Sequence, residues 1–478
     1  MQEVGIAQVC AEIDKAFKAN DFKRVETMLW PALDQFSDLP QLWFYAGNLF
    51  FQTGRAAPAV AAFERCVALD QNALVLANLG AAYRKLNQHD NGLQVLKSAL
   101  ERNPDYQPAL VNLGSMYVNE GCPELGIPYL ERAVELGGEN PERGSTWNLS
   151  LLYLEAGRFG EGFDLYRRGL GAERLMRTYG YDGCPEPEIL QPHHEGKGKT
   201  LIVWGEQGIG DEIMAATCIR DAMADFDEVI FECHPRLEWL HRTAFPEIRL
   251  YPTRKDEHIG WPISDGIKAD YKCPLLDLAA RYRRTPESFV EAHERWGNQY
   301  KPDPAEVASY RAQLEVIANG RPIVALATRG GVMQTARTYR TFRIPDADKL
   351  FESTDCLFVS IDYDDMMGFT EYVSEKYGAD RYRWFPSIVQ HWDFNHTAAL
   401  IAACDMTVTV CQSAAHLSAA MGVPTRVMTP KRCAWRYAPV WNDERWYWYP
   451  DDKVKLYRGD DNWDSVLVKV IDDIRGLK

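Results

Sequence analysis

The feature that most constrains this chain is a recurring pair of small and aromatic residues in its N-terminal third. A glycine or serine occupies positions 47, 80, 114 and 150, so the pattern returns every 33 to 36 residues. An aromatic residue follows each of them after one helical turn; these are Phe50, Tyr83, Tyr117 and Tyr153. Small residues let paired helices approach closely, and the aromatic rings fill the space between neighbouring pairs. The sequence therefore predicts a stack of helix pairs, because a single pair cannot bury its apolar face alone.

The period and the pattern are those of the tetratricopeptide repeat. Further expected positions of the first clear repeats are filled by aromatic residues, small residues and a proline: Trp43, Gly54, Ala59, Phe63, Ala99 and Pro104. A degenerate repeat around residues 20–33 is expected to cap the stack. We assign residues 1–178 to this α-solenoid.

A solenoid of this kind presents a concave groove that binds a protein or peptide. Asn78, Asn112 and Asn148 fall on the first helices of the pairs, which line the groove, and are placed to hydrogen-bond an extended peptide backbone. They are equally consistent with a solvated surface. The alternative for the whole solenoid is a structural role, in which the repeats dimerise the chain or brace an enzyme.

Composition excludes several classes of protein. The formal net charge of the 478 residues is −15, so a nucleic-acid surface is not expected. No window approaches eighteen uncharged apolar residues, and the start, Met1-Gln-Glu-Val, lacks a signal-peptide pattern, so neither a membrane span nor export is predicted. The 11 cysteines are scattered from Cys10 to Cys433 without C-x-x-C pairs. This favours reduced thiols and a cytoplasmic location.

Helical periodicity fails at residues 179–198, where glycine, proline and charged residues predict a linker. The linker contains two adjacent histidines, His193 and His194. Adjacent side chains in an extended segment point to opposite sides, so we interpret them as surface residues and not as a metal site.

After the linker, apolar runs alternate with amphipathic segments, which predicts two α/β lobes with parallel sheets, 199–304 and 305–478. The first set has strands at Lys199–Trp204, Glu228–Cys233 and Ile248–Tyr251, and helices near Glu212–Ala224 and Leu237–Ala244. The second set, after Tyr300-Lys-Pro-Asp-Pro304, has strands at Pro322–Ala327, Cys356–Ile361, Asp405–Val410 and Thr425–Met428, and helices near Ala305–Ala318, Asp346–Ser353, Thr397–Cys404 and Ser413–Met421. Two such lobes in tandem imply a cleft between them. This outline is shared by GT-B glycosyltransferases and periplasmic-binding-like folds.

The first strand of this part leads into a glycine turn, in the segment Leu201-Ile-Val-Trp-Gly-Glu-Gln-Gly-Ile-Gly-Asp211. Glu206 and Asp211 thus follow the carboxyl end of a strand, where open α/β sheets bind ligands. The glycine order is not G-x-G-x-x-G, which disfavours a dehydrogenase. Asp211 is either a functional carboxylate or an ordinary helix cap, and spacing alone favours neither.

The segment Gly205–Met214 resembles the Glu-Gln-Gly-x-Gly-Asp signature of heptosyltransferase-like domains fused to tetratricopeptide repeats. The run Ala398–Pro424 is similar to the second-lobe motif of that family. The aromatic tail is similar too, through Trp435-Arg-Tyr437, Trp446-Tyr-Trp-Tyr-Pro450, Leu456-Tyr-Arg458 and Trp463. The repeat-fused members that the chain resembles include flagellin-modifying glycosyltransferases, which implies a protein acceptor.

The resemblance implies a GT-B fold and a metal-independent, inverting transfer from a nucleotide-sugar, with no other cofactor. The family's proposed general base corresponds to Asp211, and a positioned carboxylate is what an acceptor hydroxyl needs to lose its proton during attack. Glu206 is a secondary candidate that positions the acceptor. The rest of the acceptor-side loop consists of Gln207, Gly208 and Gly210.

The leaving diphosphate requires positive charge or helix-terminal N–H groups. Three segments are candidates for this donor site. One contains Arg337, Arg340 and Arg343, whose spacing aligns them on one face; the alternative is a solvated loop. Another contains Lys431, Arg432 and Arg436. A third is the helix that begins at Ser413, with His416 as either a donor contact or a packed residue.

Two features favour other interpretations. The family usually has Asp-Thr where this chain has Cys411-Gln412, so the resemblance does not identify the donor sugar. The same departure supports an alternative function, that of a non-catalytic scaffold with an inactive glycosyltransferase domain. The segment Ile361-Asp362-Tyr-Asp-Asp365 contains the Asp-x-Asp pattern of metal-dependent GT-A enzymes. We favour an acidic loop there, because GT-A enzymes lack a second α/β lobe.

Overall fold

The chain was analysed as a computed structural model. The structure describes residues 5–120, 122–138, 143–170, 177–256, 258–330, 341–364, 368–431, 433–438, 444–460 and 462–477. The chain divides into two compact units, Met1–Leu152 and Tyr153–Lys478.

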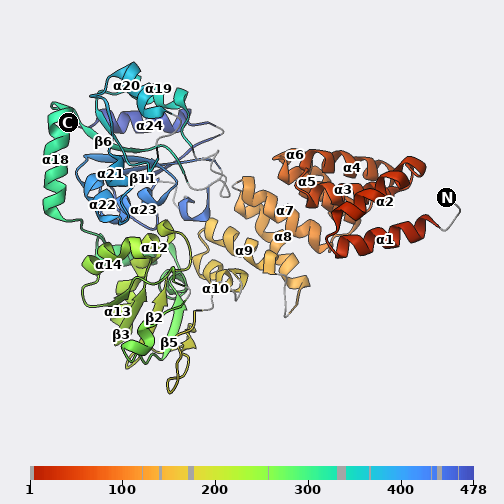
Figure 1. The fold of residues 1–478 in the computed structure, drawn as a ribbon, viewed down its shortest axis with the longest axis horizontal. Coiled ribbons are helices and arrows are strands. Elements are labelled where there is room, and N and C mark those ends of the chain that lie inside the picture. Colours follow the sequence, from red (N-terminus) through yellow and green to blue (C-terminus); the bar gives the residue numbers. More distant parts are fainter. Residues whose placement is uncertain are drawn as a thin grey trace. The chain divides into compact units, whose positions relative to one another are not determined.

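The first unit consists of antiparallel helix pairs, in which successive helices from α1 to α8 pack against each other (Figure 1). Its helices are α1 (Ile6–Lys18), α2 (Phe22–Gln35), α3 (Pro40–Gln52), α4 (Ala56–Leu69), α5 (Ala73–Lys85), α6 (His89–Arg102), α7 (Gln107–Glu120), α8 (Pro123–Leu136) and the greater part of α9 (Arg143–Glu155). No helix in the described part of the chain is long and apolar enough to cross a membrane.

The recurring glycines lie where the two helices of a pair touch. A Cβ atom at Gly47 would collide with the ring of Phe63, and one at Gly80 would collide with the side chain of Leu96. Gly114 is related in the same way to Leu130. The close approach of α3 to α4, α5 to α6 and α7 to α8 is therefore the physical reason for the small residue in each repeat.

Two of the three asparagines singled out in the sequence form hydrogen bonds to other residues of the solenoid. The Nδ2 of Asn112 donates to the carbonyl of Ala77 at 3.5 Å, and the Nδ2 of Asn148 donates to Oγ of Ser115 at 2.7 Å. Both bonds join first helices of successive pairs. The amides of Asn112 and Asn148 are thus partly engaged inside the stack.

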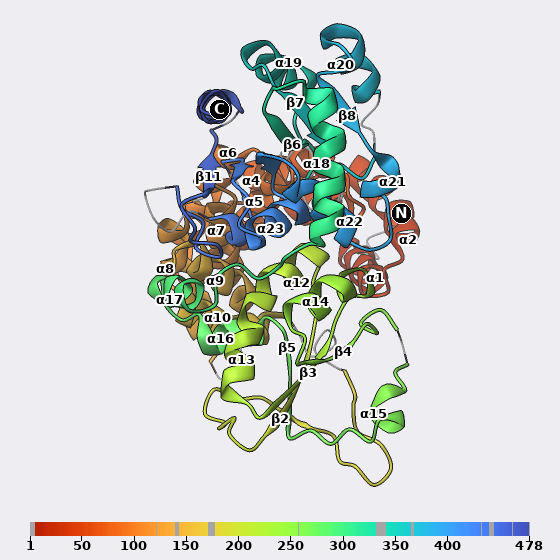
Figure 2. The same cartoon turned by 90° about the vertical axis from the view of Figure 1, so that its left-hand side faces the viewer.

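The second unit contains two parallel sheets (Figure 2). The first sheet has the strand order β1-β5-β2-β3-β4. Its strands are β1 (Glu188–Ile189), β2 (Thr200–Trp204), β3 (Glu228–Glu232), β4 (Arg249–Tyr251) and β5 (Tyr271–Pro274). The helices of this half are α10 (Phe159–Leu170), α12 (Ile209–Ala215), η1 (Ala216–Cys218), α13 (Ile219–Asp225), η2 (Pro235–Leu237), α14 (Glu238–Ala244), α15 (Trp261–Ser264), α16 (Asp277–Tyr282) and α17 (Pro286–Trp296).

The second sheet has the strand order β11-β10-β9-β6-β7-β8, which is that of a doubly wound fold. Its strands are β6 (Ile323–Ala327), β7 (Leu357–Ser360), β8 (Tyr382–Trp384), β9 (Met406–Val410), β10 (Thr425–Thr429) and β11 (Val454–Arg458). The helices of this half are α18 (Pro304–Ala318), α19 (Ile344–Ser353), α20 (Phe369–Tyr377), α21 (Pro386–Val389), α22 (Asn395–Ala402), α23 (Ser413–Ala420), η5 (Trp435–Tyr437) and α24 (Asp464–Arg475). A large apolar core between β6, β7, β9, α19 and α24 holds this half together.

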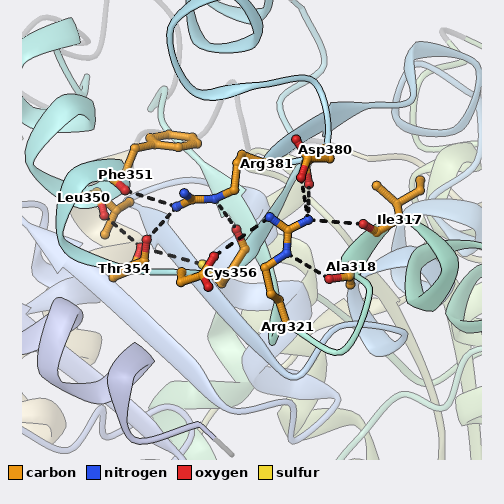
Figure 3. Close-up of polar contacts among 10 residues, drawn as sticks. Ile317, Ala318, Arg321, Leu350, Phe351, Thr354, Cys356, Asp380 and Arg381 are labelled. Atoms are coloured by element: carbon orange, nitrogen blue, oxygen red, sulfur yellow. Dashed lines mark hydrogen bonds and ion pairs between the residues drawn. The ribbon is translucent and has the colours of Figure 1, made fainter.

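Two arginines close the amino-terminal edge of the second sheet (Figure 3). The Nε of Arg321 donates to the carbonyl of Ala318 at the end of α18, at 2.8 Å. Arg381 donates to the carbonyl of Phe351 in α19 and to that of Cys356, both at 3.1 Å. Carbonyls at helix ends lack partners within the helix, and a guanidinium is well suited to satisfy them. These arginines therefore stabilise the fold at the edge opposite the carboxyl ends of the strands.

Parallel sheets were predicted from the apolar runs, and the structure has them. The predicted runs correspond to β2, β3, β4, β6, β7, β9 and β10, with ends that differ by at most one residue. The sequence did not predict β1, β5, β8 or β11, which are short or rich in polar residues. Because β1 pairs with β5, the segment predicted as a linker contributes an edge strand.

Candidate functional site

The candidate site lies at the carboxyl ends of β2 and β5. The chain proceeds from β2 to β3 on one side, while β5 pairs with β2 on the other, so the strand order reverses between β2 and β5. Open α/β sheets bind ligands at such a point. Glu206 follows β2, and Asp277 begins α16 directly after β5. Together with Asp211 in α12, these residues form what we call the carboxylate cluster.

A buried ion pair holds the glycine turn beneath this cluster. Glu212 is fully buried, and its Oε2 accepts from Nη1 of Arg254 at 2.6 Å, while its Oε1 accepts from the backbone N–H of His234 at 2.7 Å. Gly205 must lack a side chain, because a Cβ there would meet the Glu212 carboxylate. His241 and Arg254 keep the pKa of Glu212 below its usual value although burial opposes this. Glu212 is therefore a structural carboxylate that fixes the turn.

Asp211 has two partners. Its Oδ2 accepts from the backbone N–H of Gly208, the residue before α12, at 3.0 Å. Its Oδ1 forms an ion pair with Nε of Arg436, a residue of the tail that follows β10. The side chains of Asp211 and Arg436 are only 18% and 19% exposed. The structure thus brings together a residue predicted as the base and a residue predicted to bind the diphosphate.

Aromatic residues of the tail hold Arg436 in place. Its guanidinium carbon lies 4.8 Å from the centre of the Trp435 ring, and its carbonyl accepts from Nε1 of Trp446 at 2.6 Å. Burial acts to lower the pKa of Arg436, but the negative charge of Asp211 more than offsets it, so the pKa is raised. Arg436 is therefore positively charged within the site.

The other two carboxyl groups of the cluster hold their protons near neutral pH. Burial, followed by the negative charges of Asp277 and Asp211, raises the pKa of Glu206 to about 8. Burial raises the pKa of Asp277 to about 7, although the positive charge of Arg167 opposes it. Within the described residues, the buried Oε1 of Glu206 has no hydrogen-bond partner. Carboxyl groups of this kind are typical of sites that handle protons.

Helix α10 contributes residues that the sequence had not singled out. Nε of Arg167 lies 3.5 Å from Oδ2 of Asp277. Tyr166 is buried, and its environment includes the charges of Arg436, Asp211, Glu206 and Asp277. Asp277 was missed because β5 was missed, although Pro274-Leu-Leu-Asp277 has the same pattern as β2, a strand end followed by an acid.

The amino ends of α12 and α23 meet beside the cluster, and they come from the two halves of this unit. A Cβ at Gly210 would lie 3.2 Å from Cα of Ser413 and 3.2 Å from Cδ2 of His416. The predicted acceptor-side loop therefore touches the helix predicted to bind the donor. Only glycine allows this approach without displacement of the neighbouring helix.

His416 is packed inside the protein in this structure. This agrees with the second of the two roles considered for it in the sequence, that of a packed helix residue. The side chain is 1% exposed, its Nδ1 lies 3.2 Å from Oη of Tyr449, and its ring packs against Tyr437 and Trp446. Burial, aided by the charge of Arg436, lowers the pKa of His416 to about 3. The imidazole is therefore neutral and enclosed.

The arginines before α19 are not assembled with the cluster by the described contacts. Arg337 and Arg340 lie outside the described residues. Arg343 precedes α19, and its Nε lies 3.0 Å from Oδ2 of Asp346, while its side chain is 67% exposed. Arg343 thus caps its own helix, and its role toward a diphosphate stays a prediction.

The remaining predicted residues lie at the surface or outside the description. Lys431 is exposed, and its carbonyl accepts from Arg458 at 2.7 Å; Arg432 lies outside the described residues. Gln207 is partly exposed and Gly208 is exposed at the start of α12, so the acceptor-side loop is accessible.

The second sheet has its own buried carboxyl group at the carboxyl ends of its central strands. Asp362 follows β7, and its Oδ2 accepts from the backbone N–H of Thr328 at 2.9 Å and from its hydroxyl at 2.7 Å. The Nε2 of Gln412 lies 3.5 Å from its Oδ1, and Asp364 forms an ion pair with Arg329. Both acids of the Asp-x-Asp pattern thus have partners within the protein.

Comparison with known proteins identifies the repeats. The tetratricopeptide repeat family model matches residues 40–72 and 73–106. Protein FlbA of Caulobacter vibrioides is 24% identical over 448 residues, which span 83% of this chain and 72% of FlbA. BBSome complex member BBS4 of Bos taurus is 28% identical over 142 residues, 27% of each chain.

Solved structures resemble one part of the chain. The crystal structure of TTC0263, a thermophilic TPR protein in Thermus thermophilus, shares 21% identity and covers 34% of this chain and 89% of its own, with a TM-score of 0.31. The helix pairs and the family match together establish a tetratricopeptide solenoid in the N-terminal part of this chain.

Proposed function

We propose that the chain is a glycosyltransferase of GT-B architecture that transfers a sugar from a nucleotide-sugar to a protein acceptor recruited by the repeats. The observation that carries the proposal is the ion pair between Asp211 and Arg436 beside the carboxylate cluster. The resemblance to repeat-fused, heptosyltransferase-like domains supports it over nearly the whole chain. The two parallel sheets, which touch through α12 and α23, are compatible with a donor and an acceptor on facing edges.

The first step of the proposed mechanism is an exchange of partners by Arg436. The diphosphate of the donor offers the guanidinium two oxygens, and bidentate binding of phosphate is a strong charge-assisted interaction. Arg436 turns from Asp211 to the diphosphate, and Asp211 keeps its bond from the Gly208 N–H. Binding of the donor diphosphate thereby releases the base.

In the second step the acceptor hydroxyl attacks the anomeric carbon. Its oxygen forms the new glycosidic bond as the bond from carbon to the diphosphate oxygen breaks, and the diphosphate departs with the electron pair. Asp211 accepts the hydroxyl proton, and Arg436 neutralises the leaving group. Attack from the face opposite the diphosphate inverts the configuration, and no metal is needed.

Glu206 positions the acceptor in this scheme. Since its pKa is raised to about 8, its carboxyl group is mostly protonated at neutral pH and can donate a hydrogen bond to an acceptor oxygen. A protonated neighbour also adds no negative charge that would repel the diphosphate. Asp277 lies beside Arg167 in the same cluster.

The proposal is tested with a panel of nucleotide-sugars and a peptide library as acceptor. The wild-type protein releases a nucleoside diphosphate from one donor, and Asp211→Asn lowers that rate by about 10²- to 10⁴-fold, the usual contribution of a general base. Glu238→Gln, at the first turn of α14 in the same half, is the matched control and keeps the wild-type rate. Transfer by Asp211→Asn at the wild-type rate would show that Asp211 is not the base.

One observation favours a second function, that of a scaffold with an inactive glycosyltransferase domain. Asp211 is engaged by Arg436 in this structure and is not free to accept a proton. If the wild-type protein makes no product with any nucleotide-sugar but binds a peptide ligand through its repeats, the scaffold is the correct assignment.

A further inference from the structure

We propose that His391, Asp393 and His396 form a binding site for a single divalent transition-metal ion of the Zn²⁺ class, separate from the proposed catalysis. One ligand atom from each side chain lies within 4.8 Å of the other two. His391 and Asp393 belong to the turn between α21 and α22, and His396 lies in the first turn of α22.

The ligand atoms lie within 4.8 Å of one another, somewhat wider than the spacing around a bound ion. Ligands about 2.0–2.1 Å from a tetrahedral ion are about 3.4 Å from each other. Nδ1 of His391 lies 3.8 Å from Oδ2 of Asp393, and the two imidazole rings are 4.4 Å apart between centres and inclined at 78°. Since all three side chains are partly exposed, small rotations bring them to coordination distance.

The surrounding groups hold two of the ligands in orientations that suit coordination. Oδ1 of Asp393 accepts from the backbone N–H of Asn395 at 2.8 Å, which leaves Oδ2 on the side of His391. Oε2 of Glu306 lies 3.1 Å from Nδ1 of His396 and also accepts from Nδ2 of Asn395 at 3.1 Å. A carboxylate that accepts from one ring nitrogen leaves the other free for a metal and makes it more basic.

The chemistry of the donors selects the class of ion. Two imidazoles and one carboxylate suit Zn²⁺ and its neighbours, whereas Mg²⁺ and Ca²⁺ prefer oxygen ligands alone. Three protein ligands leave a further position for water. Glu306 is a positioning residue for His396.

The site would control a contact between the two halves of the second unit. Arg236, in η2 of the first half, donates from Nε to the carbonyl of Trp392 at 2.7 Å. Its own carbonyl accepts from the N–H of Phe394 at 3.0 Å, and its guanidinium lies 4.7 Å from the centre of the Phe394 ring. Trp392 and Phe394 alternate with the ligands along the chain. A bound ion therefore restrains residues 391–396, which contact Arg236 through Trp392 and Phe394. This restraint strengthens the contact between the two halves.

The test is a titration of the full-length, EDTA-treated protein with Zn²⁺ and then with Co²⁺ as a spectroscopic probe. The wild-type protein binds one Zn²⁺ per chain with a rise in Tm, since an ion that binds the folded state stabilises it. Co²⁺ gives ligand-field bands without a thiolate charge-transfer band, which excludes the exposed Cys122 as a ligand. His396→Ala removes the bound equivalent, and Glu306→Gln weakens binding by about 10- to 100-fold.

His193→Ala is the matched control, because His193 also stands beside a second histidine but in the segment before β2. It keeps wild-type binding. The three variants keep the wild-type circular dichroism without metal, so a loss of binding is not a loss of fold. Failure of the wild-type protein to bind Zn²⁺, or equal weakening by His193→Ala and His396→Ala, would overturn the proposal.

Discussion

The two parallel sheets have the same arrangement around their central strands, β5-β2-β3 in the first and β9-β6-β7 in the second. Each sheet has an acid with a buried carboxyl oxygen at the carboxyl ends of these strands, Glu206 after β2 and Asp362 after β7. In the second, Asp362 accepts two hydrogen bonds from Thr328, and burial raises its pKa only to about 6. In the first, an oxygen of Glu206 has no partner within the described residues, and the pKa rises to about 8.

The difference in hydrogen bonding between Asp362 and Glu206 distinguishes an acid with a structural role from one with a functional role. Hydrogen bonds to a carboxylate favour its charged form, so an acid satisfied by its own protein behaves as part of the scaffold. An acid buried without such bonds costs stability, and that cost is typical of a site shaped for another molecule. The first sheet therefore carries the proposed chemistry, and the second provides a rigid partner.

The largest expected effect is on turnover. Arg436→Gln removes the charge that meets the leaving diphosphate, so we expect transfer to fall by about 10²- to 10³-fold, as for loss of a transition-state donor. Arg242→Gln, an exposed arginine paired with Glu238 on α14, is the control and stays near the wild-type rate. An equal loss in both variants would assign the effect to general surface charge.

The next effect is on stability at alkaline pH. Because the pKa of Glu206 is raised from 4.5 in the unfolded chain to about 8, its contribution to stability is complete below pH 4.5 and is lost as pH rises toward 8. Glu206→Gln removes this loss. We expect its free energy of unfolding at pH 8 to exceed that of the wild type by roughly 2–4 kcal/mol, and by little at pH 4.5. Urea unfolding at the two pH values checks this.

In the second sheet, a substitution beside the buried acid is expected to lower the free energy of unfolding at pH 8, and by a smaller amount. Thr328→Val keeps the side-chain shape but removes the hydroxyl that donates to Asp362 at 2.7 Å. Hydrogen bonds to charged groups contribute about 1.5–3 kcal/mol, so the variant loses about this much at pH 8. The loss shrinks below pH 6, where Asp362 is protonated. A stabilised Thr328→Val would remove the distinction between the two sheets.

The smallest effect concerns the contact between α12 and α23. Gly210→Ala places a methyl group 3.2 Å from Ser413 and His416 and is expected to cost about 1 kcal/mol through overpacking. Gly260→Ala, where no atom lies within 4 Å of the added methyl, is the control. Thermal unfolding distinguishes the two variants.

Much of the fold could be predicted because its signals are local. The repeat period gave the helix pairs, and the apolar runs gave the central strands. The edge strands β1, β8 and β11 are short or mix polar and apolar residues, since they are less completely covered than central strands. Their pairing depends on the rest of the sheet, which no window of sequence contains.

The candidate site could be predicted only in part, for the same reason. Asp211 was identified by resemblance and Arg436 by the need for positive charge at the diphosphate, but their pairing requires two segments more than two hundred residues apart to meet. Asp277 depends on the unpredicted strand β5. The sequence left the role of His416 open between a donor contact and a packed residue, because its enclosure by tail aromatics depends on tertiary packing.

The central claim is that Arg436 exchanges Asp211 for the donor diphosphate. Thermal-shift titrations with UDP, GDP, CDP and ADP on wild type, Asp211→Asn and Arg436→Gln test it directly. The account predicts that one nucleotide stabilises the wild type, binds Asp211→Asn more tightly because Arg436 is already free, and fails to stabilise Arg436→Gln. Equal stabilisation of Arg436→Gln and wild type, or weaker binding to Asp211→Asn, would contradict the exchange.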